Sequence, residues 1–199
     1  MRTKRKKGVI QLVLAMGLAG LVSAVMNAPL ARAQQGQTAP SGQASTLAQP
    51  GQLNSKDYNF VVEAARIDME EVQGGKLAQQ RGTSQAVRNF GEHMINDHSE
   101  ANTGLKEIAT QKGAAVPTQL SQEQNSSLQK LAGLSGAEFD KAYAQDMVKG
   151  HTAAVKTFQQ AVQSATDTDL RAWAQTALPL LQEHLQMAKQ MQAAVQNEK

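Results

Sequence analysis

The chain contains no cysteine, and this absence excludes three kinds of structure. No disulfide can form, no metal site can use thiolate ligands, and no N-terminal cysteine can carry a lipid. An exported protein without disulfides must therefore be held together by packing or by a metal ion. Aromatic residues make up only 4% of the chain, so few side chains are available for stacking on nucleic-acid bases.

The positive net charge of the chain comes from its first 33 residues. The whole chain has 20 basic residues against 17 acidic ones, a formal net charge of +3. Six of the basic residues and none of the acidic ones lie in residues 1–33. Residues 34–199 therefore hold 14 basic and 17 acidic residues, a formal net charge of −3. Without its N-terminal segment the protein is mildly acidic, and nothing in this charge pattern indicates a nucleic-acid partner.

Residues 1–33 have the pattern of a secretory signal peptide. A basic segment over 2–7 precedes an apolar run over 9–25, and Ala31-Arg32-Ala33 supplies a small-x-small cleavage site. We expect cleavage there and a periplasmic or outer-membrane-associated location. The alternative is an uncleaved anchor, because the apolar run is nearly long enough to span a bilayer.

Residues 34–55 predict a flexible tether, because they are rich in Gln, Gly, Ser, Ala and Pro and have no apolar period. The tether is one means by which the protein would associate with an envelope partner. Residues 56–197 form the predicted folded domain.

The apolar residues of this domain recur at helical spacing, and no strand pattern is present. Four long helices are predicted over about 57–81, 84–112, 137–164 and 167–195, with a short helix ending near Ala132. Ser121-Gln-Glu-Gln124 and Ser135-Gly-Ala-Glu138 have the pattern of capping boxes, and Ser55 or Asp57 is expected to cap the first helix. The Gly74-Gly75 pair indicates a close helix contact or a kink. Short turns near residues 83 and 165 and a long connection between them predict an all-α four-helix bundle.

Each long helix carries one ionisable side chain within its apolar face, when residues are placed at 100° intervals. The four residues are Glu71, His98, His151 and His184. The face that contains Glu71 is predicted to consist of Phe60, Ala64, Ile67, Glu71, Gly74 and Ala78. All lie near mid-helix, within roughly 6 Å of a common level at a rise of 1.5 Å per residue. His93 lies off the apolar face and is expected on the surface.

One carboxylate and three imidazoles in a bundle core must be paired, hydrated or bound to a metal ion. This set suits a single transition-metal ion, Cu, Zn or Fe. Asp97 is a candidate for a further ligand or for the hydrogen-bond partner of a ligand. Met94 and Met147 each precede a histidine by four residues and would favour copper, although methionine also fills gaps in cores. The alternative is a metal-free polar network in which Glu71 pairs with a protonated histidine.

No catalytic residue is identified, because the chain has no nucleophile motif and no glycine-rich phosphate loop. Three functions remain as hypotheses. The first is metal binding for buffering or stress protection, and the second is a metal-free structural or envelope-interaction role. The third is a redox or peroxide-handling enzyme, against which the missing pair of Glu-x-x-His motifs argues.

Several ordered motifs over residues 56–195 resemble one bacterial family. They include Phe60-Val-Val-Glu-Ala-Ala65, Glu71-Val-x-x-Gly-x-Leu-Ala78, Phe90-x-x-x-Met-Ile-x-Asp-His98, Met147-Val-x-x-His151 and Leu178-Pro-x-Leu-x-x-His184. The family is the exported, ferritin-like "domain of unknown function" family forty-one forty-two, often labelled predicted outer-membrane protein. The resemblance implies a ferritin-like antiparallel four-helix bundle, with a long crossover between the second and third long helices that contains a short helix. The recurring Glu and His positions of the family correspond to Glu71, His98, His151 and His184, and its label implies no established activity.

Overall fold

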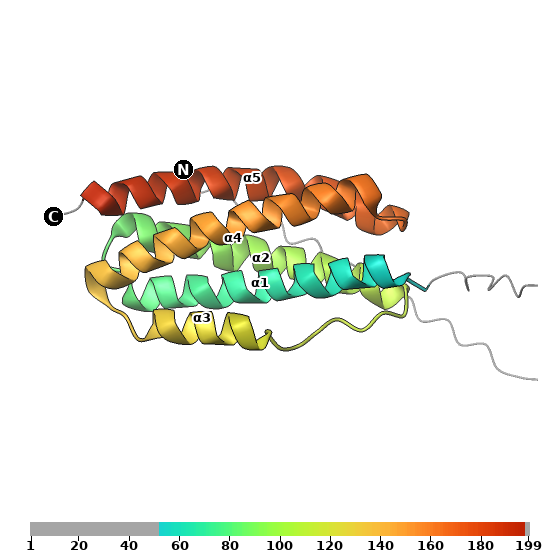
Figure 1. Ribbon diagram of the computed structural model, residues 1–199, viewed down its shortest axis with the longest axis horizontal. Helices are drawn as coiled ribbons and strands as arrows, with labels where there is room; N and C mark the ends of the chain where they lie inside the picture. The colour runs from blue at the N-terminus through green and yellow to red at the C-terminus, as the bar shows by residue number, and fades with distance from the viewer. Residues whose placement is uncertain (1–51, 198–199) are drawn as a thin grey trace, which may run out of the picture. The chain divides into compact units, whose positions relative to one another are not determined.

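Five helices make up the part of the chain that the computed structural model describes, residues 52–197 (Figure 1). They are α1 (Ser55–Arg81), α2 (Gln85–Gln111), α3 (Gln122–Ala132), α4 (Gly136–Ser164) and α5 (Thr168–Asn197). No strand occurs in these residues, which confirms the all-helical prediction. The predicted signal peptide and most of the predicted tether lie outside the described residues. None of the helices in 52–197 combines the length and apolar character needed to cross a membrane.

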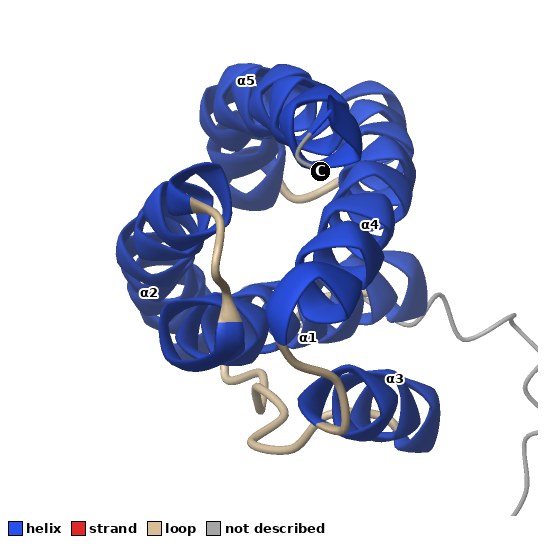
Figure 2. Cartoon of the chain, turned by 90° about the vertical axis from the view of Figure 1, so that its left-hand side faces the viewer, coloured by secondary structure: helices blue, strands red, loops and turns tan. Residues whose placement is uncertain are grey.

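The four long helices pack as two pairs. α1 packs mainly on α2, and α4 mainly on α5, and the helices of each pair are joined by the short segments 82–84 and 165–167. α2 also contacts α5, and α1 contacts α4, so the four helices surround a common core (Figure 2). The connection over 112–135 runs along the bundle and carries α3, which lies outside this ring against α1 and α4.

One of the two predicted capping boxes is present. The side chain of Ser121 accepts a hydrogen bond from the first turn of α3, and the reciprocal bond of a capping box also forms. At the start of α4, by contrast, Ser135 makes no side-chain capping bond within the described residues, so this prediction is wrong. The reason is local, because Gly136, the first residue of α4, has a φ of +61°.

α1 is capped by Asn54, whose side chain accepts from the N–H of Asp57, so the predicted cap at Ser55 or Asp57 is wrong. Asp57 instead holds the turn between α4 and α5. Its carboxylate accepts hydrogen bonds from the N–H groups of Thr166 at 3.1 Å and Asp167 at 2.8 Å. Burial alone would raise the pKa of Asp57, but the hydrogen bonds outweigh burial and lower it below 3.8.

Asp140 holds the other turn in the same way. Its carboxylate accepts from the N–H groups of Thr83 at 3.1 Å and Ser84 at 2.8 Å, and from the hydroxyl of Thr83. The first helix of each pair thus supplies a carboxylate that holds the turn of the other pair. These turns lie at opposite ends of the bundle (Figure 1).

Replacing Asp140 with alanine should lower the free energy of unfolding by about 2–3 kcal/mol, because two N–H groups lose a charged acceptor. Urea unfolding followed by circular dichroism measures this loss. Asp169→Ala is the control, because the Asp169 side chain is 56% exposed and pairs with Lys112 at the surface. That pair should contribute less than about 1 kcal/mol, and equal losses in the two variants would contradict the role of Asp140.

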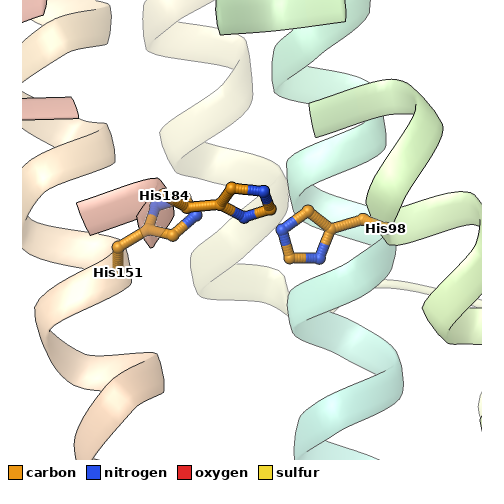
Figure 3. Close-up of side chains that lie close together, drawn as sticks. All are labelled: His98, His151 and His184. Atoms are coloured by element: carbon orange, nitrogen blue, oxygen red, sulfur yellow. The ribbon is translucent and has the colours of Figure 1, made fainter. Parts of the chain in front are cut away.

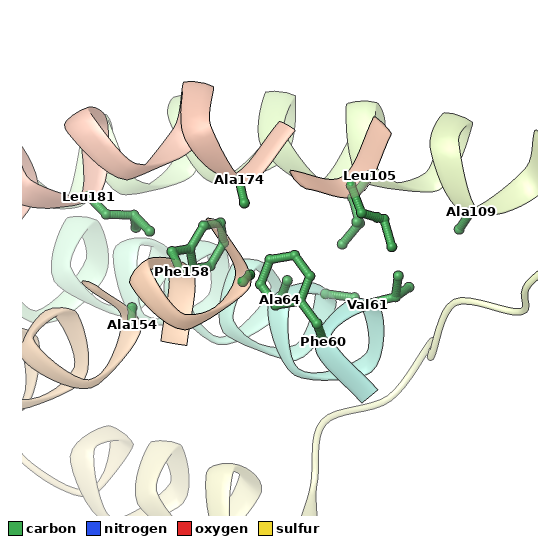
Figure 4. Close-up of a cluster of buried hydrophobic side chains, with 12 residues drawn as sticks. Phe60, Val61, Ala64, Leu105, Ala109, Ala154, Phe158, Ala174 and Leu181 are labelled. Atoms are coloured by element: carbon green, nitrogen blue, oxygen red, sulfur yellow. The ribbon is translucent and has the colours of Figure 1, made fainter. Parts of the chain in front are cut away.

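The buried apolar side chains form two clusters. The first includes Phe60 of α1, Phe158 of α4 and Leu181 of α5 (Figure 4). The second includes Phe90 of α2 and Phe139 of α4. On every long helix, a stretch with buried polar residues separates the residues that supply the two clusters. The polar layer therefore lies between two apolar layers.

Two glycines allow α1 and α2 to approach each other closely. A Cβ atom at Gly75 would lie 2.5 Å from the carbonyl oxygen of Gly91, which is too close for any side chain. The close contact predicted from the Gly74-Gly75 pair is therefore confirmed, at Gly75. Asp68 and His98 each lie seven residues from this contact along their helices, roughly 10.5 Å at 1.5 Å per residue. The contact thus sets how α1 faces α2 in the polar layer.

Candidate metal centre

Three histidines from three helices come together in the polar layer. His98 of α2, His151 of α4 and His184 of α5 are only 3%, 1% and 1% exposed. Each offers a ring nitrogen atom, and the three nitrogen atoms lie within 4.8 Å of one another. The rings point toward one another (Figure 3), with centroids 5.4 to 5.9 Å apart. We refer to these three residues as the histidine cluster.

Each ring of the histidine cluster is held by a hydrogen bond through one nitrogen atom. The three bonds are His98 Nδ1 to Asp68 Oδ1 at 2.8 Å, His184 Nε2 to Asp97 Oδ2 at 2.8 Å, and His151 Nδ1 to the Met147 carbonyl at 3.0 Å. A carbonyl oxygen only accepts, so Nδ1 of His151 carries the hydrogen. An ionised carboxylate imposes the same assignment on the other two rings.

The second nitrogen atom of each ring has no hydrogen-bond partner among residues 52–197. These atoms are His98 Nε2, His151 Nε2 and His184 Nδ1. In the neutral ring each is a lone-pair acceptor, and a buried acceptor without a donor costs about 1–3 kcal/mol. Positive charge at the centre of the histidine cluster would remove this cost.

Burial and neighbouring charges divide the cluster into two kinds of histidine. Burial lowers the pKa of His151 to about 4, and the charge of His98 acts in the same direction. Burial also lowers the pKa of His184, against the hydrogen bond with its carboxylate partner. Burial alone would lower the pKa of His98, but Asp68 and Glu71 outweigh burial and raise it above 6.5. At neutral pH, His151 and His184 are therefore neutral, and His98 is the histidine that retains a proton most readily.

Glu71, the fourth predicted site residue, lies beside the histidine cluster rather than within it. Its Oε1 atom is 3.7 Å from Nδ1 of His151, on the side of the ring that faces away from the unpaired Nε2. Glu71 is 5% exposed, and burial raises its pKa to about 7. Its Oε2 atom has no hydrogen-bond partner among the described residues.

The other residues singled out from the sequence have different surroundings. Asp97 binds the ring of His184, which is one of the two roles predicted for it. Met94 and Met147 belong to the second apolar cluster, where their side chains fill the core. His93 is exposed, as its position off the apolar face predicts.

Asp68 is the residue of the site that sequence analysis missed. It is 2% exposed and binds His98. The predicted face of α1 contained Ile67, which is only partly buried. The buried face of α1 is wider than the predicted one and includes all of its residues except Ile67. The buried residues are Asp57, Phe60, Val61, Ala64, Ala65, Asp68, Glu71, Gly74, Gly75 and Ala78. Asp57 and Asp68 are not expected to be buried when their partners are unknown, because a buried carboxylate must be paired.

The fold and this centre define a helical-bundle protein with a buried cluster of three histidines. The chain belongs to the family described as "Domain of unknown function (DUF4142)", whose profile matches residues 42–191. The family resemblance is therefore confirmed. No curated protein matches the sequence.

A solved structure is similar in fold. It is described as the crystal structure of a DUF305 fragment from Deinococcus radiodurans, with a TM-score of 0.64 and 10% sequence identity. The likeness covers 72% of this chain and 99% of that chain. At this identity the likeness concerns the fold alone.

Proposed function

We propose that this protein binds one transition-metal ion at His98, His151 and His184, for metal buffering or stress protection. The observation that carries the proposal is the convergence of three imidazole nitrogen atoms within 4.8 Å, with one unpaired nitrogen on each ring. The pattern of residues 1–33 supports export to the periplasm or outer membrane. The two helix pairs and the connection over 112–135 support a ferritin-like antiparallel four-helix bundle.

The donor set favours a borderline transition metal over a hard cation. Imidazole nitrogen suits Zn, Cu or Fe, whereas Mg and Ca prefer oxygen ligands. In a tetrahedral zinc site with Zn–N bonds of roughly 2.0–2.1 Å, ligand nitrogen atoms lie roughly 3.4 Å apart. The three nitrogen atoms, which lie at most 4.8 Å apart, therefore need to move inward by less than about 1 Å each. A water molecule would complete the coordination.

The carboxylates around the histidine cluster support the same proposal. Asp68 and Asp97 accept from ring nitrogens of His98 and His184. A carboxylate in this place fixes the tautomer and makes the other ring nitrogen a better ligand. Together with Glu71 they also balance the charge of a divalent ion.

The second candidate function is a metal-free structural or envelope-interaction protein whose polar layer fixes the register of the helices. The raised pKa of His98 favours this candidate, because a proton on Nε2 of His98 would donate to a neighbouring ring. A proton would then take the place of the metal ion. An envelope partner would be reached through the N-terminal tether.

Elemental analysis of protein purified without a polyhistidine tag tests the metal proposal. The wild-type chain should contain one transition-metal ion, and His98→Ala/His151→Ala should contain none, because only one imidazole ligand remains. His93→Ala is the matched control, since His93 is exposed and outside the cluster, and it should retain the metal. Equal metal content and equal thermal stability in the double variant and the wild type would contradict the proposal. Two ions per chain would favour a redox enzyme instead.

A further inference from the structure

A groove between α1, α3 and α4 leads from the surface to the polar layer. It has a volume of about 210 Å³, and its lining includes four carboxylates and one glycine: Glu70, Glu71, Glu123, Asp146 and Gly150. We call it the acidic groove. α3, which lies outside the ring of long helices (Figure 2), forms its outer wall.

Glu71 connects the acidic groove with the histidine cluster. Its side chain lines the groove, although the residue is only 5% exposed. On its other side, Oε1 lies 3.7 Å from Nδ1 of His151. Its Oε2 atom is buried and has no hydrogen-bond partner in the described part of the chain. A single carboxylate therefore contacts both the groove and the cluster, and one of its oxygen atoms is free to bind a cation.

Gly150 leaves Glu71 accessible from the groove. This glycine is exposed and directly precedes His151 in α4. A Cβ atom there would lie 3.5 Å from Oε1 of Glu71, so a branched side chain would cover the carboxylate. Glycine inside a helix costs about 1 kcal/mol relative to alanine, so helix stability does not account for this residue.

The charges along the acidic groove attract cations. Its four carboxylates face one lysine, Lys149. Burial raises the pKa of Glu70, the hydrogen bond that it accepts from Gln124 lowers it, and repulsion from the other three carboxylates raises it further. The carboxylates are thus close enough to repel one another, and a divalent cation between them relieves this repulsion. Clefts lined by charge of one sign also increase the rate at which an oppositely charged ion arrives.

We propose that the acidic groove is the route by which a divalent metal ion reaches the histidine cluster, with Glu71 as the carboxylate that the ion contacts last before it enters the cluster. This inference rests on the proposed metal-binding function. The other carboxylate that could receive an ion is Asp97, whose side chain is 31% exposed. Asp97 is held by its 2.8 Å hydrogen bond to His184, whereas Glu71 has a free oxygen atom.

Stopped-flow mixing of the metal-free chain with Co²⁺ tests the route, because the visible absorption of bound Co²⁺ gives both rate and affinity. Gly150→Val should slow uptake by on the order of tenfold, since a close-packed side chain leaves no passage for an ion. Its dissociation constant should change by less than about threefold, because all three imidazoles remain. Valine also has a higher helix propensity than glycine, so the helix should be retained.

The charge of the groove is tested separately. Glu123→Gln/Asp146→Asn should slow uptake several-fold at low ionic strength, and the difference should vanish at about 1 M salt. Glu92→Gln/Glu107→Gln is the matched control, because it removes two exposed charges from α2, outside the groove. This control should bind Co²⁺ at the wild-type rate.

Three results would overturn the route. The first is uptake of Co²⁺ at the wild-type rate by both Gly150→Val and Glu123→Gln/Asp146→Asn. This result would leave the metal-binding function intact, because the wild-type chain would still bind Co²⁺. The second is slower uptake in Asp97→Asn alone, which would place the route between α2 and α5. The third is no Co²⁺ binding by the wild-type chain, which would overturn the metal function itself.

Discussion

Zinc added to the metal-free protein at about pH 7.5 should raise its melting temperature by roughly 5–10 °C at a free concentration of about 100 times the dissociation constant. Binding to the folded state alone adds about 2.7 kcal/mol at that concentration. In a domain of this size, 1 kcal/mol corresponds to about 2–4 °C. Differential scanning calorimetry with and without a chelator measures the shift.

The stabilisation by zinc should decrease as the pH falls, because an imidazole must be neutral to bind a metal ion. His98 is protonated first, since its pKa is raised above 6.5. Below that pKa, zinc has to displace a proton, and the apparent affinity falls about tenfold per pH unit. His151 and His184, whose pKa values are lowered, begin to compete only in more acidic solution.

The stability of the metal-free fold also depends on pH. The melting temperature of the metal-free chain must therefore be measured at each pH. The pKa of His151 is about 4 in the folded chain, against 6.5 for an ordinary histidine. Because the folded pKa is the lower one, the contribution of His151 to stability is present above pH 6.5 and is lost as the pH falls toward 4. The zinc effect is therefore the difference between paired scans with zinc and with chelator.

Variants of the cluster separate specific binding from surface binding of zinc. His98→Ala/His151→Ala should show no zinc-dependent shift, whereas His93→Ala should show the full shift. A shift of wild-type size in the double variant would place the zinc elsewhere. No shift in the wild type, together with insensitivity to chelator, would favour the metal-free function.

Gly75→Ala should lower the free energy of unfolding by about 2–3 kcal/mol. The new Cβ atom would lie 2.5 Å from the carbonyl oxygen of Gly91 and 2.9 Å from Cγ1 of Ile95. The backbone of α2 cannot avoid this contact by a rotamer change, so α1 and α2 must separate. Separation also removes packing contacts along both helices, which outweighs the gain of about 1 kcal/mol in helix propensity.

Gly74→Ala is the matched control for this substitution. Its Cβ atom would meet only side-chain atoms, at 3.6 Å or more, so the variant should be as stable as the wild type or up to about 1 kcal/mol more stable. Urea unfolding of both variants measures the difference, and equal stabilities would contradict a close contact at Gly75. Gly75→Ala should also weaken zinc binding, because it moves Asp68 away from His98.

The helices could be predicted from the sequence because helical periodicity is a local property. Residues three and four apart share a face wherever the helix lies, so the inward positions of His98, His151 and His184 followed from spacing alone. On α1 the same reasoning placed Phe60, Ala64 and three further residues correctly on the buried face, but it missed Asp68. Ile67 was placed on the buried face and Asp68 was not, since the partner that makes burial of Asp68 favourable lies on another helix.

The amino-acid sequence by itself determined the all-helical fold, the five helical segments and the three inward histidines. Only the tertiary structure decided which acceptor holds each ring and which nitrogen remains unpaired. Asp68 and His98 are 30 residues apart, and Asp97 and His184 are 87 apart. Such pairs depend on the close approach of α1 to α2 at Gly75 and on the packing of α2 against α5. Helical periodicity describes each helix separately. It therefore carries no information on which residues of different helices lie close together.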